Sequence, residues 1–259
     1  MAGLRIAIQT RSLQQPLKQA LHAAGSLGCD GVQIDAREEL RPGELSDTGA
    51  RQLRKMLDDR NLRVGSVAFA TRRGFAEPQD LERRLTATVD ALRMASRLGA
   101  RVLVFAVGDV PPGEGPARGT LVEALASLAG HASRIGVELA AHCPQAPPAD
   151  VVALLSELPA GLMGVNLSPA DTIRAGGSPR EAVKALGPRV VHFYANDAAR
   201  GLGGGAAIDV ELGRGSADMP ELLGALEEFD YRGWITIAPH SPKRPVEEAS
   251  DAIAYLRSL

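Results

Sequence analysis

Side chains that exchange protons or hold polar ligands lie at the ends of several short apolar runs in this sequence. They are His142, Ser168, Asp171, His192, Tyr194, Asp197, Arg200 and His240. Imidazole and carboxylate groups are the usual general acids and bases of enzymes, and they are also common metal ligands. Their recurrence at these ends indicates a site for a small polar ligand, with proton transfer as one candidate reaction.

The apolar runs alternate with longer segments of helical spacing. Eight runs are predicted strands, at 4–9, 31–35, 63–68, 101–106, 136–141, 162–167, 189–194 and 234–238. Predicted helices lie near 16–27, 46–60, 78–98, 117–134, 148–157, 178–186, 218–229 and 245–257. This alternation is typical of successive βαβ units, and no change of composition divides the chain. We therefore predict a single (β/α)8 TIM barrel over residues 1–259, in which the C-terminal ends of the strands form the functional face.

Local signals mark the starts and ends of the predicted helices. Ser46 and Ser178 are suited to cap helix N-termini. Glycines at four predicted helix ends are expected to adopt a left-handed C-cap conformation, namely Gly28, Gly99, Gly136 and Gly187. The longest connection expected to be irregular spans 195–217 and carries four glycines within 201–205, so a lid or a mobile loop is expected there.

Composition excludes several classes of protein. The 259 residues are 45% hydrophobic and 23% charged, which fits a folded globular chain rather than a disordered one. With 29 basic and 31 acidic residues, a net charge of −2 and 3% aromatics, no nucleic-acid partner is expected. No apolar run approaches the ~20 residues of a membrane span, so no membrane partner is expected. The N-terminus enters a predicted strand without a leader, which predicts a cytoplasmic location.

Several motifs, taken in order, carry a resemblance to a known family. They are 4–8 (LRIAI), 27–33 (LGCDGVQ), 135–142 (IGVELAAH), 164–171 (GVNLSPAD), 190–197 (VVHFYAND), 212–215 (LGRG) and 231–237 (YRGWITI). In order and spacing the chain resembles the xylose isomerase-like TIM-barrel superfamily, which contains sugar isomerases and epimerases. The resemblance implies the barrel fold and a small sugar or polyol as the ligand.

The resemblance also implies where a metal would bind. Members of the superfamily hold one divalent cation through a glutamate, an aspartate, a histidine and a glutamate at the ends of strands five to eight, and the two glutamates exchange protons with an enediol. Carried over, these positions are Ala141, Ser168, Tyr194 and Ala238. A methyl group cannot coordinate a cation, and neutral hydroxyls are poor ligands. We therefore expect no metal cofactor; Mn, Mg, Co or Zn is expected only if His142 and His240, with Asp171 or Asp197, rebuild a site.

The residues around the replaced positions keep polar character. Asp171 and Arg200 fall where the resemblance implies substrate contacts, and His192 with Asp197 matches the family's spacing of histidine and aspartate on strand seven. We consider Asp171, His192 or His240 as the catalytic base, and Arg200, His142, Asp197, Tyr194 and Ser168 as ligand contacts. His192 has a structural hydrogen-bonding role as its alternative, and Tyr194 that of a cavity plug. His142, one residue past Ala141, is expected to point away from the barrel unless the strand has already ended.

Three functions remain to be compared. The leading one is a sugar isomerase/epimerase-like protein that binds a small sugar or hydroxy-carbonyl compound without the usual metal site. The alternative is a non-catalytic metabolite-binding or protein-interaction barrel, which the four replaced positions favour. A metal-dependent DNA-repair endonuclease on the same fold is disfavoured because five scattered histidines do not supply its ligand set. The resemblance leaves a homo-oligomer possible.

Overall fold

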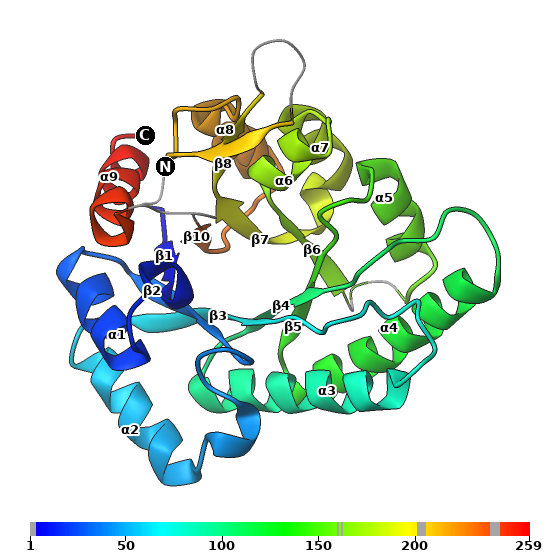
Figure 1. Cartoon of the computed structure of the whole chain (residues 1–259), viewed down its shortest axis with the longest axis horizontal. Coiled ribbons are helices and arrows are strands. Elements are labelled where there is room, and N and C mark those ends of the chain that lie inside the picture. The colour runs from blue at the N-terminus through cyan, green and yellow to red at the C-terminus, as the bar shows by residue number, and fades with distance from the viewer. Residues whose placement is uncertain (1–3, 160, 162, 201–205, 239–243) are drawn as a thin grey trace.

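The computed structural model describes residues 4–159, 161, 163–200, 206–238 and 244–259. Eight parallel strands close into a barrel in the order β1-β10-β7-β6-β5-β4-β3-β2, with helices around it (Figure 1). These strands are β1 (Ile6–Gln9), β2 (Gly31–Asp35), β3 (Arg63–Phe69), β4 (Val102–Ala106), β5 (Glu138–His142), β6 (Met163–Leu167), β7 (Val190–Ala195) and β10 (Ile235–Ile237). The predicted (β/α)8 TIM barrel is therefore confirmed.

The helices follow the strands in alternation. They are α1 (Leu17–Ser26), α2 (Asp47–Asp58), α3 (Leu81–Leu98), α4 (Pro116–Ile135), α5 (Pro148–Ser156), α6 (Pro169–Arg174), α7 (Pro179–Leu186), α8 (Met219–Glu228) and α9 (Pro245–Arg257). The predicted caps are present: the hydroxyl of Ser46 accepts from the Gly49 amide at 3.0 Å, and that of Ser178 accepts from the Glu181 amide at 3.4 Å. None of the helices described has both the length and the apolar character that a membrane span requires.

One predicted C-cap is wrong. Gly28, Gly99 and Gly136 have φ values of 77°, 79° and 77°, as the left-handed conformation requires. Gly187 instead has φ −45° and starts a short 3-10 turn. A Cβ at this position would lie 2.1 Å from Cδ2 of Phe229, so close packing against the Phe229 ring explains the glycine.

One short helix and two short strands were not predicted. Helix α6 begins directly after β6, where the Ser168 hydroxyl caps it. Within the segment 195–217, β8 (Asp197–Ala199) and β9 (Ile208–Val210) pair antiparallel, so this connection is not wholly irregular. The glycines at 201–205 lie outside the described residues.

Side chains alternate between the inside of the barrel and the layer of helices. On β5, Leu139 and Ala141 belong to the large core that includes the helices, whereas Ala140 packs inside with Val104, Tyr194 and Ala238. The strand continues to His142, which pairs with Ala106 of β4 and shares the inward direction of Ala140. The expectation that Ala141 lies at the inner end of strand five and that His142 points away is therefore wrong.

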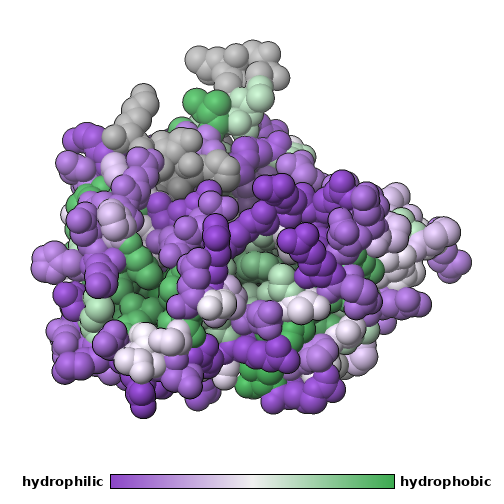
Figure 2. Space-filling model, turned by 60° about the horizontal axis from the view of Figure 1, so that its bottom comes forward, coloured by the Kyte–Doolittle hydropathy of each residue, from purple (hydrophilic) through white to green (hydrophobic). Residues whose placement is uncertain are grey.

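Trp234 closes the N-terminal end of the barrel. Its indole ring lies against Gly31 and Gly65, where added Cβ atoms would come within 2.8 and 2.7 Å of the ring. The Arg5 guanidinium covers the indole at 5.3 Å from the ring centroid, a cation–π distance. Hydrophilic residues dominate the molecular face seen in Figure 2, and hydrophobic atoms occupy smaller areas between them.

Candidate functional site

A polar cavity of about 590 Å³ lies at the C-terminal ends of the barrel strands. Side chains with hydrogen-bonding groups line it from five strands or the segments that follow them: Gln9, Arg11, Ser12, Gln14, Asp35, His142, Asp171 and Asn196. Tyr194 and Ala238 from inside the barrel, with Phe69 and Val104, supply its less polar surface. We call this space the mouth cavity. Its position is that of the functional face of TIM barrels, and its size is within the range of small-molecule sites.

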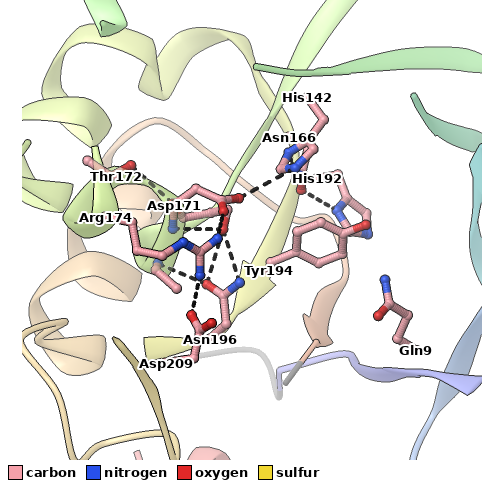
Figure 3. A network of polar contacts seen from close by, with 12 residues as sticks. Gln9, His142, Asn166, Asp171, Thr172, Arg174, His192, Tyr194, Asn196 and Asp209 are labelled. Carbon is pink, nitrogen blue, oxygen red and sulfur yellow. Dashed lines mark hydrogen bonds and ion pairs between the residues drawn. The ribbon is translucent and has the colours of Figure 1, made fainter. Parts of the chain in front are cut away.

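His142 and Asp171 meet at the wall of the mouth cavity. Nε2 of His142 lies 3.4 Å from Oδ2 of Asp171, and the two side chains are 23% and 11% exposed. The early end of β6 and the immediate start of α6 place Asp171 there, because the Ser168 hydroxyl accepts from the Asp171 amide. Arg174, one turn later on α6, pairs with Asp171 and also with Asp209 of β9 (Figure 3). The salt bridges thus connect the site to the β8–β9 hairpin.

Asn166 determines how the two neighbouring histidines hydrogen-bond. Its Oδ1 lies 2.7 Å from Nδ1 of His192, and its Nδ2 lies 2.9 Å from Nδ1 of His142. An amide oxygen only accepts and an amide NH₂ only donates. Nδ1 of His192 is therefore protonated, and Nδ1 of His142 is an acceptor, which leaves the proton of a neutral His142 on Nε2, facing Asp171.

His192 lies one layer below the cavity and is fully buried. Its Nε2 is within 3.4 Å of Gln33, Ser66 and Thr236, all from inside the barrel. Burial, and secondarily the charge of His142, lower the pKa of His192 to about 3. His192 is thus neutral at physiological pH, and it does not line the mouth cavity.

Tyr194 separates the mouth cavity from the His192 layer. Its ring makes edge contacts with His192 at 5.0 Å and with His142 at 5.9 Å between centroids. The hydroxyl donates to Oε1 of Gln33 at 2.9 Å, and burial raises the pKa of the phenol well above its ordinary value. Tyr194 is therefore a neutral floor whose hydroxyl is directed into the barrel.

The remaining predicted residues lie in different surroundings. Ser168 is buried and exchanges hydrogen bonds with the Asn196 amide. The Asp197 carboxylate accepts four backbone N–H groups, from Ala198, Gly213, Gly215 and Ala217. Exposed Arg200 donates to the Gly176 carbonyl at 2.7 Å. Asp197 and Arg200 do not line the mouth cavity, and His240 lies outside the described residues.

Sequence reasoning did not select several residues that build the site. Asn166 and Gln33 are polar residues inside otherwise apolar strand runs, and that interruption was the available signal. Gln9, Arg11 and Asp35 lie at the C-terminal ends of the first two strands, where functional side chains of a barrel are expected, but nothing in the sequence assigned them a specific role. Arg174 gave no signal, because its role depends on contact with the distant Asp209.

Comparison with known proteins gives a consistent match to one family. A family model described as xylose isomerase-like TIM barrel matches residues 21–259. A comparison with curated proteins gives no match. Among solved structures, a xylose isomerase domain protein from Planctomyces limnophilus is 23% identical, with a TM-score of 0.86 over 99% of this chain and 96% of that one.

Two further structures show the same architecture. A xylose isomerase-like TIM barrel protein from Mycobacterium smegmatis, in complex with magnesium, is 16% identical with a TM-score of 0.83, over 100% of this chain and 98% of that one. D-psicose 3-epimerase with D-tagatose from Clostridium cellulolyticum H10 is 15% identical. Its TM-score is 0.81, over 98% of this chain and 99% of that one. At these identities the likeness describes the fold.

Proposed function

The chain belongs to the xylose isomerase-like TIM barrel family, and on that basis we propose that it binds a small sugar, polyol or hydroxy-carbonyl compound in the mouth cavity. The observation that carries this proposal is the lining of that cavity by carboxylate, amide, imidazole and guanidinium groups around a Tyr194 floor. A polyhydroxylated ligand needs donors and acceptors in alternation, and these groups supply both.

We infer that the site works without the divalent metal implied by the family resemblance. The four inward-facing positions at the strand ends are His142, Ser168, Tyr194 and Ala238, once strand five is read in its observed register. The Ala238 side chain has no atom that can coordinate a metal. The Tyr194 hydroxyl is hydrogen-bonded to Gln33, and the Ser168 hydroxyl is hydrogen-bonded to Asn196. In the described part of the chain, no three His, Cys, Asp or Glu residues are placed to hold a metal ion. This donor set does not fit a divalent cation.

Isomerase/epimerase chemistry at this site would use the His142–Asp171 pair. Moving a proton between a carbon and its carbonyl-bearing neighbour needs a base that takes the proton and an acid that returns it. The Asp171 carboxylate takes the proton and the Nε2–H of His142 returns one, and both side chains line the cavity where His192 does not. A barrel that binds the same ligand without turnover is the second candidate, because Tyr194 and Ala238 replace the family's usual catalytic and metal-binding groups.

Calorimetric titration and proton exchange test the two candidates together. Three sugars named with solved structures of this fold, D-tagatose, D-fructose and D-allulose, are titrated alongside the polyol D-glucitol. We expect saturable binding of at least one, weakened tenfold or more in His142→Ala. His22→Ala, on the exposed face of α1, is the matched control and should bind as the wild type does.

Exchange of carbon-bound hydrogen in D₂O, followed by NMR, then separates catalysis from binding. Deuterium entering the bound sugar with the wild type but not with His142→Ala supports the isomerase/epimerase-like function. Binding without exchange supports the binding-only barrel. If none of the four compounds binds, the proposed function is wrong.

A further inference from the structure

A second cavity of about 230 Å³ adjoins the mouth cavity on the outer side of the barrel. It lies between the outward faces of β5 and β6 and the helices α5 and α7. Its apolar lining includes Ala146, Val151, Val165, Leu167, Ala182 and Leu186. We call this space the side pocket.

The side pocket and the mouth cavity share part of their lining. Among the described residues, His142 and Asp171 line both spaces. Their 3.4 Å contact is at the long end for a hydrogen bond. Opening it requires His142 to turn, which also gives up the 2.9 Å hydrogen bond from Asn166. Asp171 keeps its ion pair with Arg174 when His142 moves. The His142–Asp171 contact therefore lies on the boundary between the two spaces.

The side pocket has few groups to hold a charged or reactive ligand. Cys143 lines it, and burial raises the pKa of the thiol to about 12, so the sulfur is a neutral, weakly polar contact rather than a nucleophile. Thr172 Oγ1 is bonded to the Ser168 carbonyl within the α6 turn. Gln145, Asn166 and Ser168 also line it, and the side chains of Asn166 and Ser168 are already hydrogen-bonded. The apolar part of the lining favours aliphatic or aromatic groups, which gain free energy on leaving water.

We propose that the side pocket receives an apolar substituent of the ligand whose polar part occupies the mouth cavity. The ligand class is then a sugar or polyol that carries an alkyl or aryl group, rather than a free sugar alone. This inference rests on the proposed function, because the polar part must bind first for the substituent to reach the His142–Asp171 contact.

Matched probes separate the substituent from the sugar. D-fructose is compared calorimetrically with its 1-O-benzyl and 6-O-benzyl ethers, and toluene serves as an apolar probe without a sugar. We expect at least one ether to bind tenfold or more tightly than D-fructose. Val151→Phe should remove that advantage by filling the side pocket, whereas Val152→Phe, the next residue on α5, does not line the pocket and should keep it. Ala182→Leu replaces Val151→Phe if that variant does not fold.

Each outcome decides one of the two proposals. Equal affinity of D-fructose and both ethers overturns the side-pocket inference and leaves sugar binding intact. The inference is also overturned if a benzyl ether still binds more tightly than D-fructose in both Val151→Phe and Ala182→Leu. If neither D-fructose nor an ether binds, the ligand class proposed here is wrong, and D-fructose is not a ligand of the mouth cavity.

Toluene then tests the side pocket alone. Toluene binding that is lost in Val151→Phe shows that the pocket is an apolar site, and absence of toluene binding shows that it is not.

Discussion

His142 and His192 lie on neighbouring levels of the same barrel and share one amide, yet their surroundings are opposite. His192 has polar partners on both ring nitrogens and is fully buried, whereas His142 borders two cavities. Asn166 contacts both rings, through its oxygen below and its nitrogen above. Depth along the strand, rather than residue type, therefore separates a histidine that stabilises the barrel from one available to a ligand.

The comparison predicts, first, that the two histidines differ most in their contribution to stability. His192→Leu should lower the free energy of unfolding by about 4 kcal/mol, because it leaves the Asn166 oxygen and the Ser66 and Thr236 hydroxyls without their buried partner. His142→Leu should cost about 1 kcal/mol or less. Chemical denaturation of both variants measures the difference, and equal losses would remove the distinction between the two layers.

The second prediction tests which residue of strand five faces the cavity. A variant with His142→Glu, Ser168→Asp, Tyr194→His and Ala238→Glu should bind Mn²⁺ with one-to-one stoichiometry in a calorimetric titration, whereas the chelator-stripped wild type should give no saturable heat. A second variant carries Ala141→Glu in place of His142→Glu and keeps the other three substitutions. It should not bind Mn²⁺, and its free energy of unfolding should fall by about 3 kcal/mol, because a carboxylate then enters the core beneath the helices.

A reversed result would contradict the register of β5. Mn²⁺ binding by the variant that carries Ala141→Glu, and not by the one that carries His142→Glu, would require Ala141 to point into the barrel. Binding by the wild type would show that the present donor set accommodates a cation.

The third effect is the pH dependence that His192 confers, which is the smallest over the tested range at about 2 kcal/mol between pH 7 and pH 5. Its pKa is about 3 in the folded protein and near 6.5 when unfolded, so between these values only the unfolded chain binds the proton. The stabilisation is complete above pH 6.5 and falls as the pH drops toward 3, by up to about 1.4 kcal/mol per pH unit. Chemical denaturation of the wild type and of His192→Gln at pH 7, 6 and 5 measures this. We expect the difference in free energy of unfolding between them to shrink as the pH falls. The same pH dependence in both proteins would contradict a buried neutral imidazole.

Sequence reasoning predicted the barrel because its signal repeats. Eight apolar runs alternating with helical segments define the order of elements, and errors of a residue or two at each boundary do not change the topology. Helix α6 was missed because six residues are too few for a helical period, although Ser168 followed by Pro169 is a typical helix start. Strands β8 and β9 were missed because three residues carry no alternation.

The site was less predictable, because an error of one residue in where a strand ends moves the predicted side chains to the opposite face of that strand. Ending strand five at Ala141 placed a methyl group where the structure has the His142 imidazole. The partners of His192 were beyond sequence reasoning for another reason: Gln33 lies 159 residues away, and only closure of the barrel brings them together.

Trp234 is the single tryptophan of the chain, and it plugs the end of the barrel opposite the mouth cavity. Its fluorescence therefore reports the integrity of the strands without interference from anything bound at the other end. Every variant considered above leaves the indole and its contacts with Arg5, Gly31 and Gly65 unchanged, so one optical signal compares the folding of all of them on the same scale. A ligand that altered that emission would be acting through the length of the barrel.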